Sequence, residues 1–250
     1  MEKSCKVGLL TLILGGWLFL AVSPPAEGAL KWGVRAGYTR GQLRAEEGDS
    51  GFDVEKFALA GMAFGLTANI PVTSFFALQP EILYFQKGGA YDVGVPVGIP
   101  GISVNVHDTR SLAYIEVPLM LKFMIPLRGP FRPTFLVGPS LGFNLSGKLK
   151  GKIEIDVPGL SFSFNETKDL KKELNDVEFS FVVGGGFDLD LGRGVLLVDN
   201  RFFFGLKTNG FKVVVPASKF AALGFPAMED FGYDLNMFNY VMSISVGYLF

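Results

Sequence analysis

Hydrophobic and polar side chains alternate along the last eleven residues of the chain. Successive side chains of an extended strand point to opposite faces, so every second residue of the segment shares a face. One face is small and largely polar, and the other carries the apolar side chains Tyr240, Met242, Ile244, Val246, Tyr248 and Phe250. An aromatic-rich strand at a chain end is unusual in a soluble protein. It is typical of a transmembrane β-barrel, whose outer face is solvated by lipid.

Similar alternation recurs along the chain, which predicts eight strands of roughly 12–14 residues, long for globular strands but suited to tilted membrane-crossing ones. They are Lys31–Leu43, Phe57–Ile70, Phe75–Gln86, Leu112–Ile125, Thr134–Ser146, Glu178–Asp190, Val195–Lys207 and Met237–Phe250. Short links at 71–74, 126–133 and 191–194 alternate with long ones near 44–56, 87–111, 147–177 and 208–236. We therefore predict an all-β fold: an eight-stranded antiparallel up-and-down transmembrane β-barrel with long extracellular loops, closed by pairing of its last and first strands.

The smaller face of each predicted strand carries most of the mid-strand charges, which indicates a polar lumen and argues against a lipocalin-like barrel with an apolar interior. We predict a lumen charge network formed by Lys31, Arg35, Glu81, Glu116, Lys122, Asp188, Asp190, Asp199 and Arg201. Eight strands enclose little more than side-chain volume, so these charges must pair. We favour a structural plug over a relay for protons or ions. Two residues fit the outer face poorly, and each could mark a bulge or a register error: Pro80 and Asn200.

The amino-terminal segment has the features of a secretory signal peptide. Lys3 and Lys6 precede an apolar run at 7–22, and small residues follow near position 28. We predict a cleaved signal peptide at 1–28 and one barrel domain at 29–250; an uncleaved anchor helix is the alternative. Cys5 is the only cysteine, so the predicted mature chain contains neither a disulfide nor a reactive thiol.

Composition excludes several other classes of function. The net charge of −1 and pI near 5.9 give no basic surface for nucleic acid. Metal-ligand spacing and phosphate-loop motifs are missing from the sequence, so we predict no metal, cofactor or cofactor-binding residue. The single histidine, His107, could form a catalytic group with Asp108 and with Ser103 or Ser111. Residues so close together in a loop more often form a solvated turn, so we predict no catalytic residue and no enzyme.

Three segments within the predicted links are unexpectedly apolar: 93–106, 153–164 and 211–220. Extended strands that pack together as a cap above the membrane would explain this composition, and we favour that interpretation. The alternative is an exposed apolar site for a lipid, a hydrophobic solute or a partner protein.

Several segments resemble the PorT-like "porin family" of outer-membrane β-barrel proteins. The matching segments span nearly all of residues 31–250 in the expected order: Gly33–Gly37, Leu78–Gly88, Tyr114–Lys122, Gly138–Gly142, Gly184–Gly186, Asp199–Leu206 and Gly247–Phe250. The resemblance implies an eight-stranded barrel in the outer membrane of a Gram-negative-type envelope, in contact with its lipid. It also implies that the carboxy-terminal strand is the assembly signal for the barrel-insertion machinery, which would be a partner during assembly.

From these observations we expect a non-catalytic outer-membrane protein with a structural, adhesive or ligand-binding role carried by its extracellular loops. A narrow porin for small solutes and an accessory protein of an outer-membrane secretion system are the alternatives.

Overall fold

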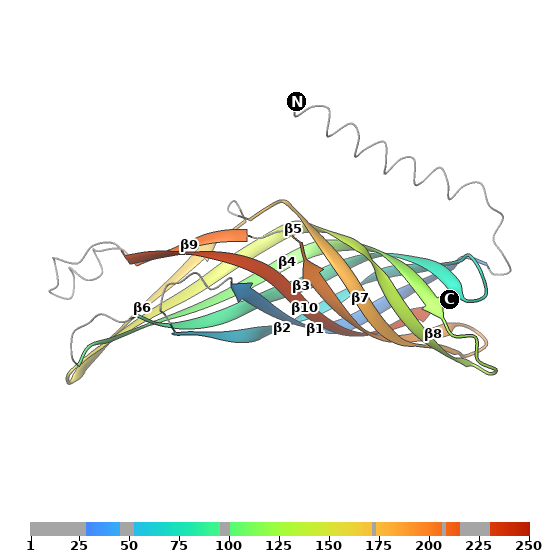
Figure 1. The fold of residues 1–250 in the computed structure, drawn as a ribbon, viewed down its shortest axis with the longest axis horizontal. Helices are drawn as coiled ribbons and strands as arrows, with labels where there is room; N and C mark the ends of the chain where they lie inside the picture. The colour runs from blue at the N-terminus through green and yellow to red at the C-terminus, as the bar shows by residue number, and fades with distance from the viewer. Residues whose placement is uncertain (1–28, 46–52, 96–100, 172–173, 207–208, 216–230) are drawn as a thin grey trace, which may run out of the picture.

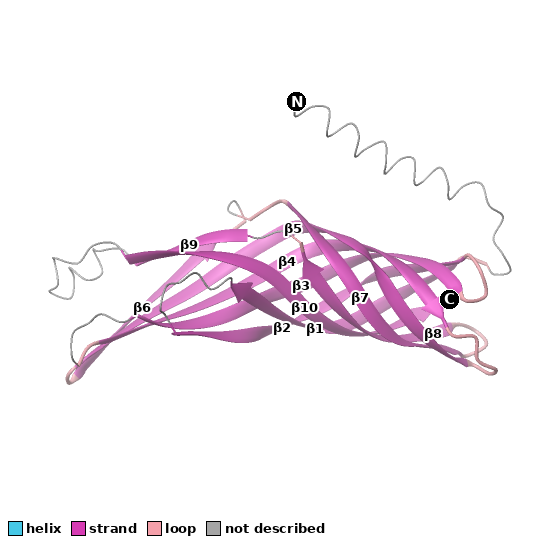
Figure 2. Ribbon diagram, in the orientation of Figure 1, coloured by secondary structure: helices cyan, strands magenta, loops and turns pink. Residues whose placement is uncertain are grey.

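The computed structural model describes residues 29–45, 53–95, 101–171, 174–206, 209–215 and 231–250, so the predicted signal peptide lies outside the described residues. Within them the fold consists of strands (Figure 2). They are β1 (Lys31–Ala45), β2 (Asp53–Pro71), β3 (Phe76–Val95), β4 (Ser103–Met124), β5 (Phe131–Val157), β6 (Leu160–Asp169), β7 (Val177–Asp190), β8 (Val195–Gly205), β9 (Asn209–Val215) and β10 (Phe231–Leu249). This described part contains no helix long and apolar enough to cross a membrane.

Eight of these strands form a closed antiparallel ring in the order β1-β2-β3-β4-β5-β7-β8-β10, which returns to β1 (Figure 1). Residues Gly33–Ala45 pair with Met237–Leu249 to close it. Closure removes the unpaired edges that an open sheet would present. The predicted eight-stranded barrel and the predicted pairing of its first and last strands are therefore confirmed.

The strands extend beyond the ring on the side opposite the carboxy terminus. β3, β4 and β5 have 20, 22 and 27 residues, and β6 pairs with the distal half of β5. We call the sheet formed by residues 87–95, 103–112 and 147–169 the projection (Figure 1). The prediction of long loops was wrong for much of 87–111 and 147–177, because backbone pairing continues from strand to strand there.

Outward-facing side chains of the ring are predominantly large and apolar. Phe64, Leu66 and Ile82 expose 48%, 57% and 57% of their surface, whereas their strand neighbours at alternate positions are buried. Exposed apolar area on this scale needs an apolar solvent. The predicted lipid-facing outer surface therefore follows from the alternation on each strand.

Two irregularities interrupt ladders of the wall on either side of the β3–β4 pair. The register between β2 and β3 shifts between Ala58 and Ala63, and that between β4 and β5 shifts at Ala113/Tyr114. The β3–β4 register continues unchanged across Pro80, and Asn200 also lies in an unshifted ladder. Neither residue therefore marks a bulge or a register error.

Candidate functional site: the filled lumen

The structure buries Arg35, Glu81, Glu116, Lys122, Asp188, Asp199 and Arg201 inside the ring, on the face predicted for them. Lys31 and Asp190 are half-exposed at the ends of their strands. The carboxylate of Asp190 accepts the backbone N–H of Gly192 at 2.9 Å, where the positive φ of +80° favours glycine. Asp190 therefore stabilises the β7–β8 turn and lies outside the buried charge clusters.

Four of the buried charges form one cluster, which we call the central cluster: Arg35, Glu81, Asp199 and Arg201. The guanidinium of Arg201 donates to both carboxylate oxygens of Glu81, at 2.8 and 3.0 Å, and to Asp199 Oδ2 at 3.2 Å. Arg35 donates to Glu81 and to Asp199 from the opposite side. Two positive and two negative groups thus neutralise each other where an isolated charge would be costly.

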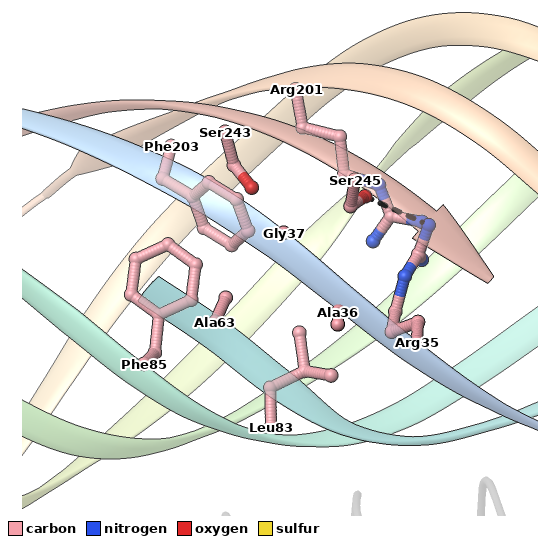
Figure 3. A pocket seen from close by; sticks show the side chains of 10 residues that line it. All are labelled: Arg35, Ala36, Gly37, Ala63, Leu83, Phe85, Arg201, Phe203, Ser243 and Ser245. Carbon is pink, nitrogen blue, oxygen red and sulfur yellow. Dashed lines mark hydrogen bonds between the residues drawn. The ribbon is translucent and has the colours of Figure 1, made fainter. Parts of the chain in front are cut away.

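Neutral side chains add further hydrogen bonds to the central cluster. Gln79 donates to Glu81 at 2.6 Å, and Thr67 donates to the same carboxylate at 3.3 Å. Ser245 accepts from Arg35 at 3.1 Å (Figure 3), and it donates to Asp199 at 2.9 Å. The cluster therefore connects β1, β2, β3, β8 and β10 across the lumen.

Glycines provide the space that the large guanidinium groups occupy. A Cβ atom at Gly184 would lie 2.8 Å from Arg201 Cγ, and one at Gly186 would lie 2.0 Å from the carbonyl oxygen of Val198. Glycine is therefore needed for close approach of β7 to β8.

An apolar layer fills the lumen directly above the central cluster, on the side of the projection. The rings of Phe85 and Phe203 face each other with centroids 4.7 Å apart (Figure 3), among the buried side chains Ala63, Leu83, Met120, Leu136, Val182 and Val241. The void between this layer and the central cluster measures about 10 Å³, close to the minimum that holds one water molecule. The expectation of a polar lumen did not include this layer.

A second charged group, the upper cluster, lies above the apolar layer and consists of Lys87, Glu116, Glu178, Tyr114 and Ser140. The ammonium of Lys87 lies 3.5 Å from Glu116 and 3.2 Å from Glu178, and 3.9 Å from the centroid of the Tyr114 ring. Ser140 donates to Glu116 at 2.8 Å. Lys87 was missed from the sequence because it lies one residue beyond the predicted strand 75–86.

A third charged contact lies below the central cluster, toward the short turns. Lys122 on β4 and Asp188 on β7 form an ion pair of 2.6 Å across the lumen. The lumen is therefore filled in layers along its axis: an ion pair, the central cluster, the apolar layer and the upper cluster.

The structure separates the residues that could have formed a catalytic group. His107 lies on the outward face of the projection, where its two ring nitrogens contact Asp92 and Glu154 at 2.7 and 3.0 Å. Asp108 points to the opposite face and binds Arg110 at 2.8 Å, while Ser103 donates to Asp156. No group of three or more metal-ligating side chains occurs among the residues that the structure describes.

The residues of the predicted assembly signal share the outward face of β10 and the residue that follows it. Tyr240, Ile244, Val246 and Phe250 are exposed, and Met242 and Tyr248 are half-exposed. Tyr248 and Phe250 form an edge-to-face ring pair with centroids 5.3 Å apart. Their role as a signal stays a prediction.

One family model and several solved structures are similar to this chain. A family model described as "Outer membrane protein beta-barrel domain" matches residues 23–209, whereas no curated protein sequence matches the chain. Among solved structures, the outer membrane protein OprG from Pseudomonas aeruginosa is similar at 11% identity and a TM-score of 0.42, with 91% of this chain and 99% of that chain covered.

Two further solved structures are similar at the same level. The outer membrane protein AlkL in lipid bilayers has 14% identity, a TM-score of 0.38 and coverage of 91% and 95% of the two chains. The outer membrane protease OmpT from Escherichia coli has 8% identity, a TM-score of 0.40 and coverage of 88% and 96%. The family model spans most of the chain, so the chain belongs to the outer membrane protein β-barrel domain family and is located in the outer membrane.

Proposed function

We propose that this protein is a closed, non-catalytic membrane anchor that holds a rigid polar β-sheet outside the cell, in a structural or adhesive role. The observation that carries the proposal is the combination of a filled lumen with strands that continue far beyond the ring. A solute would have to displace both the central cluster and the Phe85–Phe203 layer, since the void between them is only about 10 Å³.

The packing of the projection supports this role. Its inward face buries Tyr91, Val93, Val104, Val106 and Ile155, each exposed by 5% or less. Its outward face carries polar residues in register across β3, β4, β5 and β6, such as the row Asp92, His107, Lys152 and Asn165. The described part of the apolar run 93–106 therefore supports a packed cap, whereas Leu160 and Phe162 of the run 153–164 are exposed and part of the run 211–220 lies outside the described residues. The polar face is the surface left for contact with molecules outside the membrane.

Site-specific labelling of intact cells tests this arrangement, because the only cysteine of the chain lies in the predicted signal peptide. Ser163 is exposed on β6 and Ser74 is exposed in the short turn at the opposite end of the ring. We expect a membrane-impermeant maleimide to label Ser163→Cys and to leave Ser74→Cys unlabelled. Permeabilised cells, in which both variants should react, provide the control.

Labelling of Ser74→Cys alone on intact cells would place the projection in the periplasm and would overturn the proposed function.

A further inference from the structure

We propose that the wall of the barrel carries a binding site for an anionic membrane lipid, held by its phosphate, at the base of the projection. The site consists of the outward side chains of Lys148 and Lys150 on β5, together with a groove beside them. This inference goes beyond the proposed function and does not depend on whether the lumen is closed.

The two lysines lie on the outward face directly beyond the lipid-facing part of the same strand. Phe143 and Leu145 expose 43% and 42% of their surface. Lys148 lies on the same face three residues later, because the register shift at Ala113/Tyr114 interrupts the period-two alternation of β5. At a rise of roughly 3.3 Å per residue, this places its Cα about 10 Å farther along the strand. The position matches the boundary where hydrocarbon gives way to lipid headgroups.

Neither lysine has an ion-pair partner among the residues that the structure describes, and both are exposed. Lys152, the next outward lysine on β5, is paired with Glu154. The acidic residue across from Lys148 on β6 is Asp169, whose carboxylate accepts the backbone N–H of Lys171 at 2.8 Å. Lys148 and Lys150 are therefore available as a pair for an external anion.

Hydroxyl groups lie beside both lysines. Ser111 is directly opposite Lys148 on β4, and Thr109 is directly opposite Lys150. Lysine side chains two residues apart on one face of a strand start roughly 7 Å from each other, so both ammonium groups can reach one phosphate. Ammonium and hydroxyl donors together are suited to phosphate oxygens.

The groove lies next to Lys148, where the β2–β3 and β4–β5 ladders are irregular. It has a volume of about 240 Å³ and is lined by Ala60, Tyr84, Gln86, Ser111, Ser146 and Lys148. The side chain of Gln86 replaces a ladder contact there, because its Oε1 accepts the backbone N–H of Met62 at 3.2 Å. At roughly 30 Å³ per water molecule, the volume has room for a lipid headgroup.

Continuity with the apolar wall argues for a lipid as the occupant. A headgroup seated between Lys148 and Tyr84 would place its acyl chains along the exposed side chains of Phe143 and Leu145. A free phosphate ion would use the lysines but gain nothing from this apolar surface. The wall and the charges together therefore favour an anionic lipid over a soluble anion.

Native mass spectrometry of the detergent-solubilised full chain, titrated with phosphatidylglycerol or phosphatidylcholine, tests the proposal. We expect phosphatidylglycerol to bind more tightly, and Lys148→Gln/Lys150→Gln to weaken its binding by about 30-fold. Lys148→Arg/Lys150→Arg should retain binding. The matched control is Lys168→Gln/Lys171→Gln, which removes equal charge from the same end of the molecule but leaves the groove intact.

Heat-modifiable migration on gels verifies that each variant is folded. If the glutamine variant does not fold, the arginine variant still tests the proposal, because it should retain binding. Equal affinity of the folded wild type and glutamine variant for phosphatidylglycerol would overturn the proposal, as would equal affinity of the wild type for both lipids. Displacement of phosphatidylglycerol by millimolar inorganic phosphate would overturn the choice of a lipid and indicate a site for soluble anions.

Discussion

At Glu81, two guanidinium groups approach a single buried carboxylate that also accepts from Gln79 and Thr67. The ion pairs are confined by the wall and by the apolar layer, so water cannot replace a partner that is lost. Truncating one member of such a group is costly mainly because the others remain charged and buried. The central cluster thus stabilises one arrangement of five strands and occupies the space that a channel would need.

Replacing Glu81 by Gln should therefore destabilise the folded barrel by about 3–5 kcal/mol. Urea-induced unfolding in detergent micelles, followed by tryptophan fluorescence, measures this change. Glu55→Gln, at an exposed carboxylate of β2, is the matched control and should shift stability by no more than about 0.5 kcal/mol. The double variant Glu81→Gln/Arg201→Gln should lose less than the sum of the two single losses, because it restores charge balance. Additive losses would contradict coupling within the central cluster.

His107 provides a pH-dependent contact within the projection, outside the membrane-spanning segments. The hydrogen bond to Asp92, with a further contribution from Glu154, raises the pKa of the imidazole above 6.5. A raised folded-state pKa means that the contact stabilises the projection fully below about pH 6.5. The stabilisation is lost as the pH rises through the higher folded-state pKa.

The single histidine makes this prediction measurable by NMR of the imidazole protons in the full chain. We expect a titration midpoint above 6.5 in the wild type and a lower midpoint in Asp92→Asn, which removes the main cause of the shift. A wild-type midpoint at or below 6.5, or one that Asp92→Asn leaves unchanged, would argue against the bridge between β3, β4 and β5.

At the scale of the strands, period-two alternation was sufficient to predict the eight elements of the ring and the faces of Arg35, Glu81 and Arg201. The apolar runs at 93–106 and 153–164 favoured strands that extend above the membrane, but alternation could not give the bounds of β6 and of the distal part of β5, because these segments expose residues on both faces. Polar and apolar residues mix there in a way that resembles a loop. The partners within each charge cluster also could not be predicted, since Glu81 and Arg201 are 120 residues apart and meet only because the ring is closed.

The last strand combines a structural role with the proposed role in assembly. The backbone N–H of Phe250 donates to the carbonyl oxygen of Trp32 at 2.7 Å, whereas its side chain is 68% exposed. The ladder between β1 and β10 already extends to Leu249. The ring of Phe250 therefore contributes little to the folded wall, which leaves it free for the predicted contact with the insertion machinery.

Deletion of Phe250 should accordingly lower the amount of protein in the outer membrane while leaving the unfolding midpoint of the purified barrel nearly unchanged. Immunoblots of fractionated membranes and urea titration of the purified protein measure the two quantities. Deletion of Leu30, an exposed residue near the start of β1, is the control for the unfolding measurement on the purified barrel. Normal outer-membrane levels of the Phe250 deletion would refute the assembly role.

At the scale of the whole molecule, the ring places an apolar surface toward lipid, closes its own lumen and extends its strands on one side. The exposed apolar side chains of β2 and β3 face the lipid, while the layers around Glu81 and Phe85 fill the lumen. These features agree with an anchor that presents a projection, and they argue against a passage for solutes. The central claim is therefore that the barrel does not conduct.

Electrical recording in planar lipid bilayers tests that claim most directly. Purified full-length protein should give no steady current above that of protein-free bilayers at any holding potential that the membrane tolerates. Heat-modifiable migration of the recovered sample verifies that folded protein was inserted. Stable, stepwise conductance that increases with the amount of inserted protein would contradict the closed lumen and favour a narrow porin.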